Sequence, residues 1–357
     1  MDSTLDLTET DRKAGQVFMV GMPGPSLDKD TESLIRHYNP AGIILFSRNI
    51  EDPIQLALLC RDLQDAAMKY QGVPLFISID QEGGRVARLQ KPFTIFAGNE
   101  AIGRDEDPLK RAKEFGSITA AEMKLVGLNM NLAPVLDIRK GEAERHLTGR
   151  TFSDDHKTVS TLGAAVIKTL QDNGIMAVAK HFPGLGRADM DPHYHLPVIK
   201  SEKEDIEKIN LHPFRSAIRA GVSGIMTSHA IYPSLDTERP ATLSPVILSD
   251  LLRNKMGFKG LIITDDLEMG AITEKSSVAQ ATLNAFLAGA DILLICKEQQ
   301  CLSDGVDLMR KNLFSKDIRK VQLGQAISRI IKTKKKYLHD VKKISLKKAE
   351  KYFSLKK

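Results

Sequence analysis

The chain has no tryptophan, and aromatic residues make up 5% of its 357 residues. It has three cysteines, Cys60, Cys296 and Cys301, which form neither an even set for disulfides nor the paired spacing of a metal site. Nothing in their surroundings marks any of them as catalytic. We therefore interpret them as buried or incidental thiols and expect no disulfide framework.

Long apolar runs are also lacking, and none approaches the roughly 20 residues that a helix needs to cross a bilayer. The chain opens with the polar stretch Met1–Asp6 instead of a basic region followed by an apolar segment. We expect a soluble, cytoplasmic protein with no membrane span. No tract rich in proline, glycine and serine divides the chain, whose length suits one large barrel or two ordinary domains.

The formal net charge of +6 is concentrated at the C-terminus. Residues 331–357 hold eleven lysines against Asp340 and Glu350, so the rest of the chain is slightly acidic. Such an end could contact nucleic acid, an anionic membrane or an acidic polymer, but we favour a solvated charged helix or a disordered end. Because it has few aromatic residues on which bases could stack, we expect no nucleic-acid partner.

Short runs rich in valine, isoleucine and leucine alternate with longer segments of helical period. The runs lie at residues 15–20, 42–46, 75–79, 128–133, 175–179, 223–227, 260–264 and 291–295. Intervening segments such as Leu56–Leu63 and Val159–Leu170 favour parallel strands joined by helical crossovers. We predict an α/β fold, a single-domain (β/α)8 barrel of the TIM type over residues 1–340 with a lysine-rich tail at 341–357. Two separate domains are the alternative.

Polar residues concentrate at the C-terminal ends of these runs, where barrels of this type carry their chemistry. Residues drawn at random from buried strands would be mostly apolar, so the concentration supports both the fold and the place of the site. Singly, each residue could instead be structural, and Asp137 in particular could brace a loop. The residues are Arg48, Asp80, Asp137, Lys180, His181, His229 and Asp265.

The segment 180–197 is unusually rich in titratable groups, with one lysine, three histidines and two aspartates directly after an apolar run. Pro192 stiffens the backbone between Asp191 and His193, a carboxylate and an imidazole that could orient and charge-stabilise each other. The alternative is a surface connection whose polar residues face water.

The text of this segment, KHFPGLG followed by RADM, DPH and LP, resembles the signature of the glycoside hydrolase family 3 β-N-acetylglucosaminidases. That signature runs KHFPGHG, a short spacer, D-S-H and L-P. This chain departs from the signature at Leu185, Arg187, Ala188 and Pro192. These differences leave open the conformation of the loop and the identity of the sugar or aglycone beyond the terminal residue. Further matches are GIILFSRN (42–49), IDQEGGRVARL (79–89), NLAPVLDI (131–138), GRTF (149–152), MTSHAIYP (226–233), PATLSP (240–245) and ITDDLEMGAI (263–272).

The resemblance, to the compact form found in bacterial cell-wall recycling, implies a retaining exo-β-N-acetylglucosaminidase acting on peptidoglycan-derived muropeptides. Asp265 would attack the anomeric carbon, and His193 with its partner Asp191 would be the acid/base. No metal or cofactor is expected, and the partner is a small carbohydrate. The residues implied to grip the sugar are Asp80, Arg88, Arg150, Lys180 and His181, with His229 and Arg48 as further candidates.

Asp266 is expected to point away from Asp265, because strand side chains alternate, and to be structural. An adjacent acidic pair could also serve substrate-assisted hydrolysis through the acetamide. Other functions stay open: a family 3 β-glucosidase, a Schiff-base aldolase or lyase using Lys180, and a non-catalytic sugar-binding protein. We expect removal of residues 341–357 to leave hydrolysis of a small substrate nearly unchanged.

Overall fold

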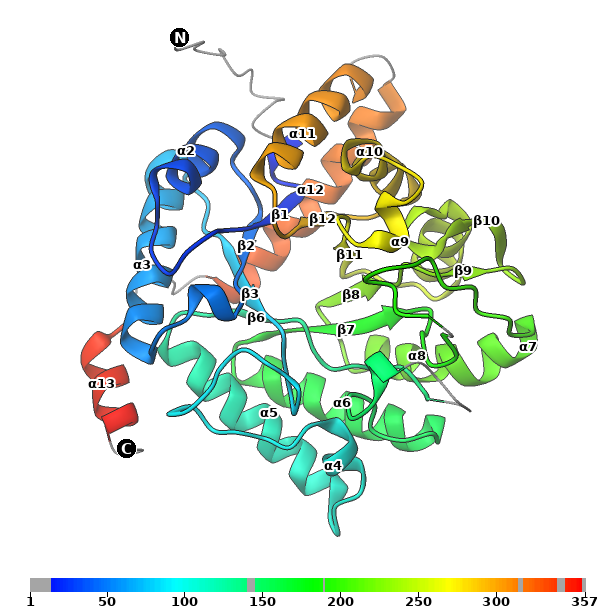
Figure 1. Ribbon diagram of the computed structural model, residues 1–357, viewed down its shortest axis with the longest axis horizontal. Coiled ribbons are helices and arrows are strands. Elements are labelled where there is room, and N and C mark those ends of the chain that lie inside the picture. The colour runs from blue at the N-terminus through cyan, green and yellow to red at the C-terminus, as the bar shows by residue number, and fades with distance from the viewer. Residues whose placement is uncertain (1–13, 140–144, 189, 314–316, 339–343, 355–357) are drawn as a thin grey trace.

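The computed structural model describes residues 14–139, 145–188, 190–313, 317–338 and 344–354 (Figure 1). In this part of the chain, eight parallel strands follow one another around a barrel, and the last pairs with the first. The predicted (β/α)8 barrel is confirmed, and every predicted apolar run overlaps one barrel strand. The strands are β1 (Phe18–Gly21), β2 (Gly42–Ile44), β3 (Phe76–Ile79), β6 (Met130–Asn131), β7 (Met176–Phe182), β8 (Gly224–Thr227), β11 (Leu261–Asp266) and β12 (Ile292–Ile295).

Helices surround the barrel and bury its outer face (Figure 1). The predicted run Leu56–Leu63 lies in α3 and Val159–Leu170 in α6, and Asp52 and Asp155 cap these helices by accepting backbone N–H groups. The longer helices are α2 (Lys29–Tyr38), α3 (Pro53–Tyr70), α5 (Pro108–Leu125), α6 (His156–Asp172), α8 (Leu211–Arg219), α10 (Val278–Ala288), α11 (Gln299–Leu313) and α12 (Asp317–Tyr337), with a π-helical segment at Val246–Lys255.

Helix α12 crosses the N-terminal mouth of the barrel. Arg329 donates to Asp291 at 2.7 Å and Lys334 to Gln16 at 3.1 Å, and both partners lie just before a barrel strand. Burial lowers the pKa of Lys334 to about 7. The functional loops therefore belong to the opposite mouth, where the strands end.

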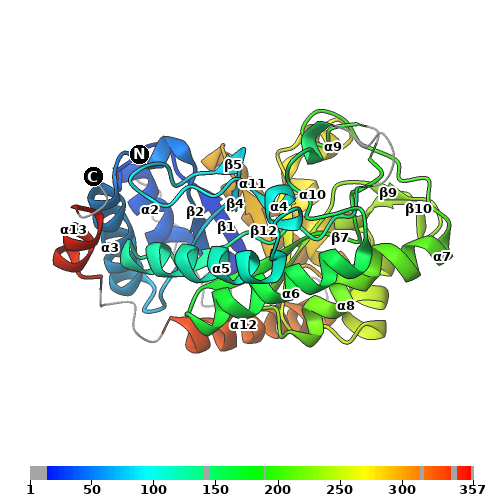
Figure 2. The same cartoon turned by 90° about the horizontal axis from the view of Figure 1, so that it is seen from below.

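Two small hairpins decorate that opposite side, which Figure 2 shows facing away from α12. They are β4 (Gln81–Gly83) with β5 (Val86–Ala87), and β9 (Ile231–Tyr232) with β10 (Asp236–Pro240). Gly83 and Gly84 make the turn of the first hairpin with φ angles of 85° and 59°, which glycine adopts without strain. Two short helices lie in loops that follow barrel strands: α4 (Asn99–Gly103) between β3 and β6, and α9 (Gly270–Thr273) after β11.

The C-terminal helix α13 (Leu346–Ser354) packs on the barrel through one apolar face. Phe353 is buried with its ring centroid 4.6 Å from that of Phe93, while Lys347 and Lys351 are exposed. A Cβ on Gly127 would lie 2.4 Å from Ile344 Cδ1, so the missing side chain makes room for this segment. The expectation of a solvated tail is therefore wrong for residues 346–354. The predicted boundary at residues 340 and 341 lies outside the described residues.

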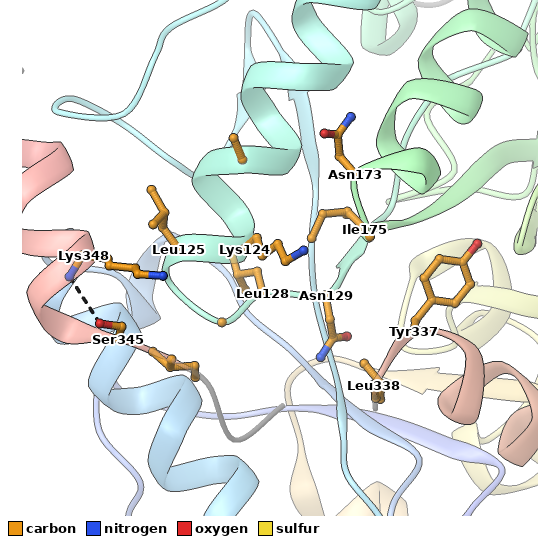
Figure 3. Close-up of a pocket in the computed structure, with 14 residues that line it drawn as sticks. Lys124, Leu125, Leu128, Asn129, Asn173, Ile175, Tyr337, Leu338, Ser345 and Lys348 are labelled. Carbon is orange, nitrogen blue, oxygen red and sulfur yellow. Dashed lines mark hydrogen bonds between the residues drawn. The ribbon is translucent and has the colours of Figure 1, made fainter. Parts of the chain in front are cut away.

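A cavity of about 580 Å³ lies between this C-terminal segment and the ends of α5 and α6 (Figure 3). Lys124 and Lys348 border it, together with apolar and amide side chains. Among its described lining residues there is no carboxylate or imidazole, so this cavity holds no group of the kind predicted for the nucleophile or the acid/base. As for membranes, the described part of the chain holds no helix that is long and apolar enough to span one.

Candidate active site

Two adjoining cavities open where the barrel strands end. The smaller measures about 120 Å³ and the larger about 530 Å³. Asp265 and His193, the predicted nucleophile and acid/base, border both cavities, as do Asp80 and Arg88. Lys180, His181 and Arg150 line the smaller cavity, whereas Asp191 and Arg48 line the larger one. The structure thus brings these predicted residues together around one continuous site.

Asp265 lies near the end of β11 and accepts the backbone N–H of Asp266 at 2.9 Å. Burial opposes its ionisation, but the nearby His181 and the accepted N–H outweigh burial and hold the pKa of Asp265 below its usual range. A carboxylate that is ionised at neutral pH has the charge that a nucleophile needs.

The structure does not support the prediction that Asp266 points away from Asp265, because the two residues border the same cavity. The pairing of β11 with β12 is irregular between Ile263 and Asp266, and both aspartates line the larger cavity. An irregularity of this kind interrupts the alternation of side chains. Burial, together with the charges of Glu268 and Asp265, raises the pKa of Asp266 to about 7. The two neighbouring carboxyls therefore differ in protonation.

His193 and Asp191 form a hydrogen-bonded pair. Asp191 Oδ1 lies 2.7 Å from His193 Nδ1 and also accepts the His193 backbone N–H at 3.0 Å. Partial burial opposes ionisation of Asp191, but both contacts with His193 lower its pKa below the usual range. An ionised Asp191 selects the tautomer with the proton on Nδ1, which leaves Nε2 for proton transfer.

The loop that carries this pair is fastened to the chain that follows Asp265. Gly270 donates its N–H to His193 O at 3.0 Å, and Ala271 donates to Pro192 O at 3.2 Å. A Cβ on Gly270 would lie 2.4 Å from Tyr194 O, so only glycine permits this approach. The loop of the acid/base candidate is therefore held against the chain that follows the nucleophile candidate, although His193 follows β7 and Asp265 lies on β11.

A buried network of charges forms one wall of the smaller cavity. Lys180 Nζ lies 2.7 Å from Asp80 Oδ1 and 2.7 Å from Glu82 Oε1, and Arg88 reaches Asp80 at 3.4 Å. Arg150 donates two hydrogen bonds to Glu82. Burial opposes these charges, but Lys180 and Arg150 outweigh it and hold the pKa of Glu82 far below its usual range.

Sequence reasoning missed Glu82, although it stands in the quoted motif IDQEGGRVARL. Its position in the short strand β4 does not by itself indicate a role. The role becomes clear only from the contacts that Lys180 and Arg150 make with it from other elements. The available signal was an acidic residue between an apolar strand and a glycine turn, two positions after Asp80.

His181 is oriented by Asp137, whose carboxylate lies 2.7 Å from its Nδ1. Asp137 also accepts the backbone N–H groups of Leu185 at 2.7 Å and His181 at 3.3 Å. Burial opposes its ionisation, but these contacts lower the pKa of Asp137. Asp137 thus braces the loop, as one of the sequence interpretations had it, and also positions His181 at the cavity.

His229 does not line either cavity, so the structure gives no support to its candidacy as a substrate contact. Its Nδ1 lies 2.8 Å from Thr242 Oγ1 and its Nε2 lies 2.9 Å from Asp266 O, which occupies both ring nitrogens.

Arg48 does line the larger cavity, where it donates to Cys296 O at 2.8 Å and to Met22 O at 3.0 Å. It therefore ties the ends of two neighbouring strands at the rim.

The fold is a closed parallel barrel, and its strand ends carry an ionised carboxylate and an imidazole held by a second carboxylate. These features define a (β/α)8-barrel enzyme with its active site at the C-terminal ends of the strands. The model of the family "Glycosyl hydrolase family 3 N terminal domain" matches residues 9–333 of the chain. This chain belongs to glycosyl hydrolase family 3. The predicted resemblance to that family is confirmed.

Individual relatives agree with this assignment. "Beta-hexosaminidase" of Nitrosomonas eutropha is 37% identical over 78% of this chain and 80% of its own length. "Beta-hexosaminidase A" of Pseudoalteromonas piscicida is 34% identical over 87% of this chain, which spans only 56% of that protein. The solved family 3 β-N-acetylglucosaminidase of Paenibacillus sp. superposes with a TM-score of 0.89 at 34% identity and covers 93% of this chain and 63% of its own.

Proposed function

We propose that this chain is a retaining exo-β-N-acetylglucosaminidase that releases a terminal N-acetylglucosamine. The observation that carries the proposal is the placement of Asp265 and His193 on the border of one small polar cavity. The names of the relatives support the choice of sugar. A muropeptide as the natural substrate is a proposal that rests on the sequence resemblance, and a cytoplasmic location is a proposal that rests on the sequence.

In the first step, Asp265 attacks the anomeric carbon while protonated His193 donates a proton to the departing oxygen. The ionised Asp191 stabilises the imidazolium through its contact with Nδ1. The glycosidic bond breaks as the bond to the Asp265 oxygen forms, giving a glycosyl-enzyme. In the second step, neutral His193 takes a proton from water, which displaces Asp265 from the same carbon. Two inversions give net retention.

We assign the grip on the terminal sugar to the groups that line the smaller cavity. Asp80 offers carboxylate oxygens to hydroxyl groups, while Lys180 and Arg150 donate to ring substituents. Their mutual contacts hold these groups in place before the sugar arrives. The larger cavity, with Arg48 on its rim, is the proposed place of the leaving group.

The charge state of Lys180 argues against the Schiff-base alternative. Burial opposes its protonation, but Asp80 and Glu82 outweigh burial and hold the pKa of Lys180 above its usual range. A nucleophilic lysine needs a lowered pKa, so that its neutral amine is available. Trapping with borohydride and a carbonyl substrate is therefore expected to leave Lys180 unmodified.

Hydrolysis of matched p-nitrophenyl β-N-acetylglucosaminide and β-glucoside tests the proposal directly. We expect the wild-type chain to cleave the N-acetylglucosaminide with the higher kcat/KM, and Asp265→Ala to cleave neither. A preference for the glucoside would indicate the family 3 β-glucosidase. If the folded wild-type protein hydrolyses neither substrate, the result would favour a sugar-binding protein without catalysis.

A further inference from the structure

His146 lies in a short 3₁₀ turn, Arg145–Leu147, four residues before Arg150. It is 6% exposed and lines the smaller cavity together with Lys180, His181 and Asp265. Neither of its ring nitrogens has a hydrogen-bond partner among the described residues. His146 is not among the site residues predicted from the sequence.

The backbone of His146 is firmly held, although its ring nitrogens have no partner within the residues that the structure describes. Its carbonyl oxygen accepts hydrogen bonds from Arg85 at 2.7 Å and from Arg150 at 3.3 Å. These contacts place the imidazole at the cavity wall without using either nitrogen. By contrast, both carboxylate oxygens of the buried Glu82 accept hydrogen bonds from Arg150, and the buried Asp137 accepts the N–H of Leu185. His146 thus presents unused hydrogen-bonding groups where the others do not.

Buried polar groups without a partner are rare, because such a group has lost its hydrogen bonds to water and gained none in return. A ligand in the cavity would relieve this loss. The chemistry of the imidazole defines that ligand, because burial lowers the pKa of His146 to about 4 in spite of the opposing charge of Asp191. A neutral imidazole has one donor and one acceptor nitrogen, which suits a hydroxyl group and offers no charge to an anion.

We propose that His146 is a specificity-determining residue whose imidazole hydrogen-bonds to one hydroxyl group of the terminal N-acetylglucosamine. The inference rests on the proposed function and adds a sugar contact to it. His146 differs from Lys180, Arg150 and Arg88 in that it contributes no charge to the cavity. Its contact therefore recognises the position of a hydroxyl without attracting charged sugars.

The inference is tested with His146→Phe and His146→Ala on p-nitrophenyl N-acetylglucosaminide and its 3-, 4- and 6-deoxy analogues. We expect kcat/KM on the parent substrate to fall by roughly 10- to 100-fold, the loss of one hydrogen bond in a buried site. The same variants are expected to show little or no loss on the one analogue that lacks the contacted hydroxyl. His146→Gln, which keeps a donor and an acceptor, is expected to recover part of the activity. His37→Phe, at an exposed histidine of α2, is the matched control and is expected to change none of these values.

Thermal unfolding separates a sugar contact from a structural role. Because the ring makes no hydrogen bond to any described residue, His146→Phe is expected to keep or raise the Tm while losing most of the further rise that N-acetylglucosamine produces. A lower Tm with an equal loss of kcat/KM on all four substrates would overturn the inference, as would unchanged kinetics. Absence of hydrolysis by the wild-type protein would overturn the proposed function itself.

Discussion

Arg150 donates two hydrogen bonds to Glu82 in the wall of the candidate site, from Nε to Oε2 at 2.8 Å and from Nη2 to Oε1 at 2.9 Å. Both side chains are nearly inaccessible to solvent. Such a pair is stable only while both charges are present, because removal of one leaves the other buried and uncompensated. Glu82 also neutralises Lys180 and therefore positions two of the proposed sugar-binding cations.

Glu82→Gln is expected to lower the free energy of unfolding by about 3–5 kcal/mol, as for other broken buried ion pairs. It is also expected to raise KM, because Arg150 and Lys180 lose their common anchor. Urea unfolding and steady-state kinetics measure the two effects. Glu114→Gln, which breaks an exposed pair with Arg111, is the control and is expected to change neither. Unchanged stability and KM in Glu82→Gln would contradict the role that we assign to this pair.

Much of the fold follows from local sequence pattern. Strands of a parallel barrel are buried on both faces, so they appear as short apolar runs, and polar residues such as Asp80 and Asp265 mark their C-terminal ends. For this reason the residues that line the candidate site could be predicted from the sequence. The dyad was also visible in the sequence, because Asp191 and His193 lie only two positions apart.

The missed features depend on contacts between distant parts of the chain. Asp266 borders the same cavity as Asp265 where the pairing of β11 with β12 is irregular, which period-two alternation does not reveal. The docking of α13 depends on Phe93 and Gly127, far away in sequence, so its many lysines suggested a solvated tail instead. The role proposed for His146 depends on ring nitrogens that have no hydrogen-bond partner in the described part of the chain, a feature that only the three-dimensional structure can show.

The C-terminal helix yields a second prediction, which replaces the expectation that the tail is dispensable. Phe353→Ala is expected to destabilise the protein by about 3–5 kcal/mol, the usual range for loss of a buried phenylalanine. Thermal unfolding measures the effect. Lys351→Ala, on the exposed face of the same helix, is the control and should leave the Tm close to that of the wild type. An equal Tm for all three proteins would restore the earlier interpretation of a solvated tail.

The burial of Lys334 is expected to make the free energy of unfolding depend on pH. Its pKa is lowered to about 7 in the folded protein, so between pH 7 and the ordinary lysine range near 10.4 the unfolded state binds one more proton. The free energy of unfolding should therefore rise with pH across this window, by about 1.4 kcal/mol per unit from this group. The measurement is the difference between wild type and Lys334→Met in urea unfolding at several pH values. The variant should be more stable at pH 7, with the difference shrinking toward pH 10, and a constant difference would show that Lys334 titrates normally.

The acid/base pair is tested by varying the leaving group. His193→Ala is expected to slow cleavage of a poor alkyl or sugar leaving group by about 10²- to 10⁴-fold, yet to spare formation of the glycosyl-enzyme from a fluoride or dinitrophenyl donor. Asp191→Asn should act in the same direction, because it removes the charge that stabilises the imidazolium. His195→Ala is a matched control on the same loop, since His195 is exposed and paired with Glu274. Equal slowing for good and poor leaving groups would mean that His193 only positions the sugar.

The most direct test of the central claim is the site of covalent labelling by a fluorosugar inactivator. Trypsin is expected to release Gly260–Lys275, which contains both Asp265 and Asp266, so fragmentation in the mass spectrometer must place the added sugar. We predict that the label lies on Asp265, and that Asp265→Ala takes up none while Asp266→Asn is still labelled. A label on Asp266, or no label on a wild-type protein that hydrolyses the matching N-acetylglucosaminide, would contradict the proposed mechanism.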